Sequence, residues 1–158
     1  MTAAKQWVLA SRPEGAPTND NFRLEDAELP GLSDGQILVE NTFSSVDPYM
    51  RGRMNDVKSY IEPFQIDEPL NGTAIGTVTE SRSSKFKAGD TVRHFAGWRT
   101  HAVLNEDRVE QINTTIASAE AYLGILGLTG LTAYVGLTAV GEMKEGDVVF
   151  ISGAAGAV

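Results

Sequence analysis

The pattern of apolar and polar residues along the chain changes character near residue 112. Upstream of that point, short runs of apolar, β-branched and aromatic residues are separated by turn-forming Gly, Pro, Asn and Asp about every 10 residues. Short strands with regular turns are typical of a small barrel or a folded sheet. The pattern therefore predicts a mainly β fold with strands at 5–10, 21–26, 36–43, 72–81, 86–92 and 98–104.

Two features interrupt this run of strands. Pro48 follows the strand at 36–43 and predicts the start of a short helical turn, because its fixed φ suits the first turn of a helix. Residues 55–70, which include Pro63 and Pro69, have the composition of a long surface loop. The strand at 72–81 contains two glycines, which predict a bend or a close approach of another backbone.

Downstream of residue 112 the pattern predicts helices. Residues 118–124 and 130–140 are apolar nearly all round, as expected of helices packed between two domains, and Ser118 is a plausible N-cap. The apolar, β-branched run at 148–152 then predicts a buried parallel strand. We expect a domain boundary near 112–117, which gives one domain at 1–115 and a second at 116–158.

The segment 153–158 reads Gly-Ala-Ala-Gly-Ala-Val and follows that predicted strand directly. Gly153 and Gly156 fit a Gly-x-x-Gly-x-x-Gly spacing whose third glycine would be the next residue. A glycine-rich turn between a strand and a helix can hold a dinucleotide pyrophosphate, although the same residues can also form an ordinary tight turn. Because a complete nucleotide site needs further strands and helices, we expect these residues to be the front part of a longer, nucleotide-dependent enzyme.

Composition excludes several classes of protein. The formal net charge is −8, which argues against a nucleic-acid or anionic-membrane partner, since both require clustered Lys and Arg. The chain has no cysteine, so a disulfide framework and a thiolate metal site are excluded. With neither a signal peptide nor a run of about 20 apolar residues, a cytoplasmic location is expected.

Few side chains suggest catalysis by themselves. His94 and His101, the only histidines, fall in strand-like segments without the carboxylates that a metal site would need, so a structural role is expected. Tyr49 follows Pro48 and is close to Arg51 and Arg53. Its phenol could donate a hydrogen bond to a substrate carbonyl, and packing of its ring in the core is the alternative.

An ordered series of motifs nevertheless resembles one known family. The series is similar to the zinc-independent medium-chain dehydrogenases/reductases, and within them to NADPH-dependent curcumin reductases, alkenal double-bond reductases and prostaglandin reductases. The resemblance covers essentially the whole chain. It is carried by Trp-Val-Leu-Ala-Ser-Arg-Pro at 7–13, Val-Asp-Pro-Tyr-Met-Arg-Gly-Arg-Met at 46–54, Gly-Trp at 97–98, Gly-Leu-Thr-Gly-Leu-Thr-Ala-Tyr-Val-Gly-Leu at 127–137, and the glycine-rich segment at 153–158.

The resemblance implies a fold and the absence of a metal. It implies a chaperonin-10-like (GroES-like), partly open barrel up to about residue 115, followed by two linking helices and the first strand of an incomplete Rossmann domain. Zinc-dependent relatives carry a cysteine near Val46-Asp47 and a Gly-His-Glu triplet near residue 72. This chain has Asn71-Gly72-Thr73 and no cysteine. We therefore expect that no catalytic zinc is bound.

The resemblance also implies an activity. Relatives of this branch reduce the α,β double bond of enones and enals by hydride transfer from NADPH, and the enolate that forms needs a hydrogen-bond donor at the carbonyl oxygen. By position, Tyr49 would lie along the substrate cleft as the candidate catalytic donor, and Thr132 near the nicotinamide ribose. Ala154, Ala155, Gly156 and Ala157 would lie near the pyrophosphate. The preference for NADP comes from the resemblance alone.

The sequence leaves alternatives to this function open. The chain alone is expected to be inactive, as the N-terminal part of an enone or enal reductase. A non-catalytic GroES-like binding or assembly module, or a reductase of the quinone oxidoreductase type, would share many of the same features. The expected partner is a small enone or enal, with no nucleic acid and no membrane. The apolar segment at 118–152 is expected to pack against a second copy, as a homodimer or a higher assembly, or else to be disordered.

Overall fold

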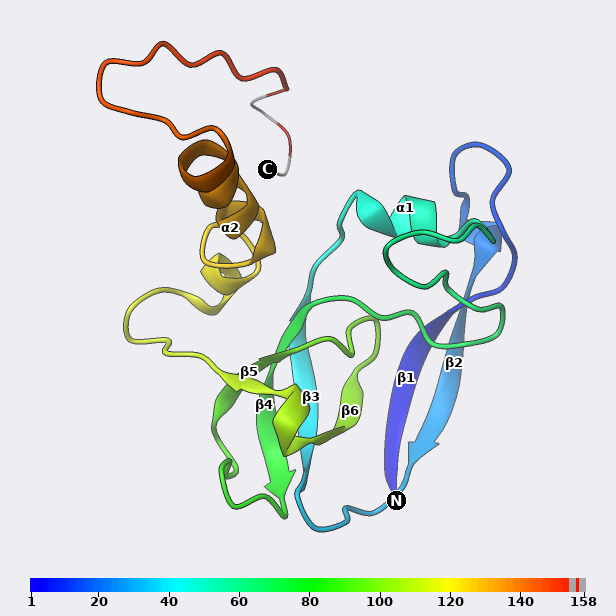
Figure 1. The fold of residues 1–158 in the computed structure, drawn as a ribbon. Coiled ribbons are helices and arrows are strands. Elements are labelled where there is room, and N and C mark those ends of the chain that lie inside the picture. Colours follow the sequence, from blue (N-terminus) through cyan, green and yellow to red (C-terminus); the bar gives the residue numbers. More distant parts are fainter. Residues whose placement is uncertain (154–155, 157–158) are drawn as a thin grey trace. The chain divides into compact units, whose positions relative to one another are not determined.

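The computed structural model describes residues 1–153 and 156, and it divides into two compact units, residues 1–113 and 114–158 (Figure 1). The strands all belong to the first unit and α2 to the second. The two units are treated separately below.

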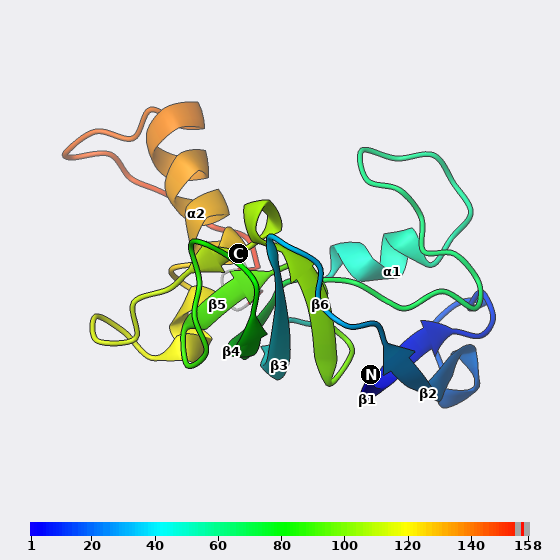
Figure 2. The same cartoon turned by 90° about the horizontal axis from the view of Figure 1, so that it is seen from below.

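The first unit consists of two antiparallel sheets. One is a hairpin of β1 (Thr2–Leu9) and β2 (Phe22–Leu29), and the other has five strands in the order β6-β3-β4-β5-β7. Figure 2 shows β1 and β2 standing apart from the larger sheet. The strands of the larger sheet are β3 (Gln36–Ser44), β4 (Ala74–Ser81), β5 (Thr91–His94), β6 (His101–Asn105) and β7 (Glu110–Gln111). Two short 3₁₀ turns, η1 (Asn19–Asn21) and η2 (Glu106–Arg108), lie outside the sheets. The predicted mainly β fold is confirmed, as an open sheet rather than a closed barrel.

The larger sheet is held together by residues that alternate along its strands. Ile37 and Val39 of β3 face inward and form a fully buried cluster with Val78 and Val92. Burying one such side chain contributes about 1.5–3 kcal/mol, so this cluster fixes the register of three strands. Gly76 confirms the predicted close approach, because a Cβ there would overlap the backbone carbonyl of Glu40.

A second cluster positions the short helix α1 (Tyr49–Arg53). Its buried members are Leu9, Met50, Met54, Phe64 and Leu70. Residues 55–70 have no long regular element, as predicted, but the description as a surface loop is incomplete because this loop contributes two of these core side chains. The guanidinium of Arg53 anchors the loop: its Nε donates to the Glu62 carbonyl at 2.8 Å and it lies 3.9 Å from the centre of the Phe64 ring.

The second unit departs from the prediction in two places. The helix predicted at 118–124 is a single 3₁₀ turn, η3 (Ala119–Tyr122), and Ser118 occupies its N-cap position without a side-chain capping bond. The helix predicted at 130–140 begins earlier, as α2 (Leu128–Val135), and continues as a π-helical segment, η4 (Gly136–Val140). The first helix is short because Gly124 and Gly127 follow it closely, and glycine disfavours helix continuation.

The strand predicted at 148–152 is not formed. These residues have no strand structure, and Val148 and Phe150 are fully or almost fully exposed. A parallel strand exists only when neighbouring strands satisfy its backbone groups and cover both its faces, and the described part of this unit contains no other strand. The predicted strand is therefore wrong for this structure, because the described residues do not supply the pairing that it requires.

The helices do not have the burial or the length of membrane segments. Leu131 and Tyr134 of α2 are 58% and 67% exposed, although the pattern predicted helices packed on both sides. Among residues 1–153 and 156, no helix is both long and apolar enough to cross a bilayer.

A buried histidine joins the larger sheet to the loop that follows β5. His94 donates from Nε2 to the Oδ1 of Asn41 at 2.9 Å and accepts at Nδ1 from the backbone N–H of Ala96 at 3.1 Å. Both ring nitrogens are thus used by the neutral imidazole, with the proton on Nε2. Burial and, to a smaller extent, the positive charge of Arg99 lower the pKa of His94 to about 4. The structural role predicted for His94 agrees with this environment.

This histidine should make the stability of the fold depend on pH. The unfolded chain takes up a proton at His94 near pH 6.5, whereas the folded chain does so only near pH 4. Between these values the unfolded state binds more protons, so stability is lost as the pH falls, by at most about 3 kcal/mol from this group. Urea unfolding at several pH values should show this loss.

The matched variant is His94→Gln, whose amide can replace both hydrogen bonds but cannot be protonated in this range. It should be less stable at pH 7 and lose less stability on acidification. His101→Gln, on the same sheet, serves as the control. Equal pH dependence in the wild type and His94→Gln would contradict the prediction.

Candidate functional site

Tyr49 begins α1, and its hydroxyl group is buried without a hydrogen-bond partner among the described residues. The preceding turn is fixed by its own bonds: the N–H of Met50 donates to the Asp47 carbonyl at 3.0 Å, and the Ser45 hydroxyl donates to the Asp47 carboxylate at 2.8 Å. Burial raises the pKa of Tyr49, the charge of Asp47 raises it further, and Arg53 opposes both. The phenol is therefore a neutral donor at physiological pH.

A second unpaired donor comes from Trp98. Its indole Nε1 is also buried without a partner among the described residues. The residue has φ +61°, a left-handed conformation that is unfavourable for a bulky side chain. Two bonds hold it there: its N–H donates to the Ser44 hydroxyl at 3.2 Å, and its carbonyl accepts from the N–H of Trp7 at 2.8 Å. The backbone conformation of Trp98 thus determines the direction in which its indole points.

The two unpaired donors both lie close to Gly72. A Cβ built on this glycine would be 3.7 Å from Trp98 Nε1 and 3.8 Å from Tyr49 Oη, and it would overlap the terminal methyl of Met50. Glycine therefore leaves a small space close to both donors, which the Met50 methyl occupies. A substrate oxygen that displaces this flexible side chain and approaches both donors to hydrogen-bond distance could accept from both.

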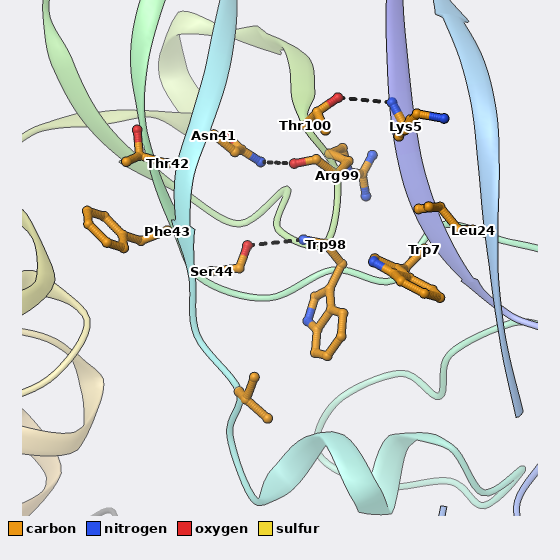
Figure 3. A pocket seen from close by; sticks show the side chains of 11 residues that line it. Lys5, Trp7, Leu24, Asn41, Thr42, Phe43, Ser44, Trp98, Arg99 and Thr100 are labelled. Atoms are coloured by element: carbon orange, nitrogen blue, oxygen red, sulfur yellow. Dashed lines mark hydrogen bonds between the residues drawn. The ribbon is translucent and has the colours of Figure 1, made fainter. Parts of the chain in front are cut away.

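Next to this space is an open pocket of about 430 Å³, whose wall includes Trp98. In Figure 3, Trp7 and Leu24 line the side of the β1–β2 hairpin and Phe43 and Ser44 line the side of β3. Its lining is largely apolar and aromatic with a few polar groups, as is usual for sites that bind small organic molecules. The other lining residues are Lys5, Asn41, Thr42, Val46, Arg99 and Thr100.

The charges close to Tyr49 have opposite signs: the carboxylate of Asp47 raises its pKa and the guanidinium of Arg53 lowers it. Arg53 is 93% buried, and apart from its bond to the loop it donates from Nη1 to Asn71 Oδ1 at 2.6 Å. No ion pair joins it to a carboxylate within the part of the chain that the structure describes. Desolvation lowers the pKa of Arg53, which still remains a cation. Its field favours negative charge near the phenol of Tyr49.

The structure does not bring the predicted site residues into one unit. Tyr49 lies in the first unit, whereas Thr132 lies on α2 in the second, where its hydroxyl donates to the Leu128 carbonyl at 2.7 Å. Gly156 is in a turn closed by its N–H and the Gly153 carbonyl at 2.8 Å. The cofactor contacts expected of Ala154, Ala155 and Ala157 lie outside the described residues. These roles stay predictions.

The contribution of Trp98 to this site cannot be recognised from the sequence alone. The pair Gly97-Trp98 contributed to the family resemblance, but nothing in its local sequence indicated an unpaired donor. The available signal was Gly97 itself, because a Cβ there would be only 2.9 Å from the Gly72 carbonyl. Asn41 and Gly72 were missed for the same reason, since their importance depends on contacts between distant segments.

The described residues also offer no obvious metal site. Among residues 1–153 and 156, no group of three or more His, Cys, Asp or Glu side chains is arranged to hold an ion. Where the zinc-dependent relatives are expected to carry a cysteine and a Gly-His-Glu triplet, this chain has Val46-Asp47 and Asn71-Gly72-Thr73, with neither a cysteine nor a histidine.

Comparison with known proteins relates this geometry to named enzymes. The chain is 48% identical over 159 residues to YfmJ of Bacillus subtilis, which is named as an NADP-dependent oxidoreductase, covering 100% of this chain and 47% of that protein. It is 38% identical over 154 residues to the NADPH-dependent curcumin reductase of Escherichia coli, covering 98% of this chain and 45% of that protein. The chain thus spans about half the length of the curated relatives it matches.

A solved structure agrees with these relatives. The crystal structure of CurA from Vibrio vulnificus in complex with NADPH matches with a TM-score of 0.89 and 40% identity, covering 97% of this chain and 45% of that chain. The predicted fold class and the predicted resemblance are confirmed by these similarities. Residues 5–112 match the family described as the N-terminal domain of oxidoreductase, and the chain belongs to that family.

Proposed function

We propose that these residues form the substrate-binding part of an NADPH-dependent reductase that acts on the α,β double bond of enones and enals. The observation that carries this proposal is the buried hydroxyl of Tyr49, which has no partner among the described residues and lies close to Gly72 together with the indole of Trp98, a residue of the pocket wall. A buried donor without a partner costs about 1–3 kcal/mol, which a substrate carbonyl would offset by accepting its hydrogen bond. The names of the relatives support the same chemistry.

In this proposal the chain's own residues bind and polarise the carbonyl group. Tyr49 donates to the carbonyl oxygen and remains protonated, because burial and Asp47 both raise its pKa. Arg53 adds a positive field as negative charge grows on that oxygen during reduction. The aromatic and aliphatic wall of the pocket holds the carbon skeleton and excludes water.

The second unit is assigned to the cofactor. We propose that 1–115 is the substrate domain and 116–158 the start of a nucleotide-binding domain, in which Thr132 and residues 154–157 contact NADP. Gly153 has φ +69°, a conformation that suits glycine and that phosphate-binding turns use. When bound, the reduced cofactor supplies the hydride for the reaction.

Activity should therefore require a longer chain. The 158-residue chain should not oxidise NADPH in the presence of curcumin or a long-chain alkenal, whereas a form that continues through a complete nucleotide-binding domain should. Absorbance of NADPH measures both. Turnover by the 158 residues alone would contradict the assignment of the second unit. A longer form without activity on enones, enals or quinones would favour the non-catalytic binding module.

Tyr49→Phe should lower kcat/KM of the longer form while leaving its affinity for NADPH nearly unchanged. Removing a main donor to a developing oxyanion typically costs about 2–4 kcal/mol in the transition state, or roughly 30- to 1000-fold in rate. Steady-state kinetics with an enone measure this change. An unchanged kcat/KM would show that the ring of Tyr49 serves only packing.

The exposed apolar residues of the second unit support a homodimer. Ile125, Leu131, Tyr134 and Phe150 are exposed within this unit, and apolar surfaces of this kind are commonly covered by a partner. The 158-residue chain should sediment as a dimer, and a chain ending at Asn113, the last residue of the first unit, as a monomer. Two monomers in this comparison would exclude an interface at 118–152.

A further inference from the structure

We propose that Trp98 provides a second hydrogen bond to the substrate oxygen, from its indole Nε1–H, next to the bond from Tyr49. This inference rests on the proposed function and adds to it a residue that positions and polarises the carbonyl. It assigns to the site a two-donor arrangement made by one phenol, one indole and the glycine close to both.

The burial of two unpaired donors around one point carries the inference. Trp98 Nε1 and Tyr49 Oη are the two side-chain polar atoms that are buried without a hydrogen-bond partner in the described part of the chain. Both lie within 3.8 Å of the Cβ position of Gly72. Folded proteins pair nearly all their buried donors, so two unpaired ones that face the same space indicate an acceptor that comes from outside the chain.

The backbone at Trp98 supports a functional role over simple packing. A left-handed φ at a bulky residue costs on the order of 1–3 kcal/mol and persists only where the surroundings enforce it. Here the hydrogen bonds to Ser44 and Trp7 hold the main chain of Trp98. The surrounding loop is held by Asn41, whose Nδ2 donates to the Ala96 and Arg99 carbonyls at 2.9 Å each. A residue that only filled space would not require this conformation.

The side chain of Met50 can fill the space next to Gly72, which excludes water, and can also move to admit a substrate. Its terminal methyl lies where a Cβ on Gly72 would be, close to both donors. Its sulfur is 3.5 Å from the backbone N of Asp47. An unbranched thioether side chain changes rotamer easily, so a carbonyl group entering from the pocket can displace the methyl. The Tyr49 hydroxyl and the Trp98 indole N–H would then lie against the carbonyl oxygen, which accepts their hydrogen bonds, in place of the apolar methyl of Met50.

The chemistry requires donors at this place. As the double bond is reduced, negative charge collects on the carbonyl oxygen, and preorganised donors in a dry site stabilise that charge more than the neutral carbonyl. An N–H and an O–H aimed at the same oxygen can both be satisfied because a carbonyl oxygen has two lone pairs. Trp98 therefore favours the transition state more than the bound substrate.

The indole N–H can be observed directly in the 158-residue chain, because Trp7 and Trp98 are its only tryptophans. Two indole resonances are expected in a ¹H–¹⁵N spectrum, and Trp7→Phe assigns them. Cyclohexenone should move the Trp98 indole proton downfield, as a new hydrogen bond does, whereas cyclohexene, which lacks the oxygen, should not. A Trp98 resonance that responds equally to both ligands, or to neither, would overturn the proposal.

Gly72→Ala provides a test of the shared space. Its methyl would fill the space close to both donors, and the overlap with the flexible end of Met50 can be relieved, so the fold should persist while the downfield shift is lost. Gly31→Ala is the matched control, because a Cβ there meets nothing within 4 Å and the shift should remain. A full shift in Gly72→Ala would also contradict the proposal.

Kinetics of the longer form separate this inference from the proposed function. Trp98→Phe keeps an aromatic ring and the same backbone requirement but removes the N–H. It should lower kcat and kcat/KM for an enone by a similar factor, about 10- to 100-fold, with KM for NADPH unchanged. Normal kinetics of Trp98→Phe beside an impaired Tyr49→Phe would overturn the role of Trp98 and leave the proposed function intact. An inactive wild-type longer form would count against the proposed function instead.

Discussion

The side-chain amide of Asn41 is the constraint on which the candidate site depends. It lies in β3 where the pairing with β4 shifts register, and it uses both ends: its nitrogen donates to two carbonyls of the loop after β5, and its oxygen accepts from His94. Backbone bonds to Trp7 and Gly72 also hold this loop, and the amide of Asn41 adds a donor to the Ala96 and Arg99 carbonyls. The left-handed conformation at Trp98, and with it the direction of the indole, follows from this arrangement.

The same arrangement determines the electrostatics of the site. His94 stays neutral because burial and Arg99 lower its pKa, so the amide of Asn41 always meets a donor at the ring. Arg53 and Arg99 are both desolvated, and Arg99 donates to the Leu70 carbonyl at 2.9 Å rather than to a carboxylate. Buried cations bonded to neutral carbonyls keep most of their field. These two cations favour a negative oxygen near Tyr49 and Trp98, and the carboxylate of Asp47 opposes them at Tyr49.

The sequence predicts this fold well where the information is local. The alternation in β3 and the proline before α1 gave element types that the structure confirms, because side-chain burial in a sheet and the φ of proline are decided within a few residues. The strand predicted at 148–152 was wrong because a parallel strand depends on partner strands elsewhere in the sheet. Tyr49 was found from its motif, whereas Trp98 and Gly72 were not, since an unpaired donor is visible only once segments 26 residues apart in the chain meet.

Glycine at position 72 connects these observations to the chemistry. In a zinc-dependent enzyme, a metal ion can polarise the oxygen of the substrate, and it needs several ligating side chains around one point. Here that neighbourhood holds Gly72, the methyl of Met50 and two neutral N–H and O–H donors. Neutral donors stabilise an oxyanion less than a divalent cation does, so they must be dry, fixed in direction and directed at the same atom. The burial of both donors keeps them dry, and the enforced backbone of Trp98 fixes the direction of its indole. The missing Cβ of Gly72 leaves room for one oxygen near both donors, which is why a glycine, and no larger residue, suits this position.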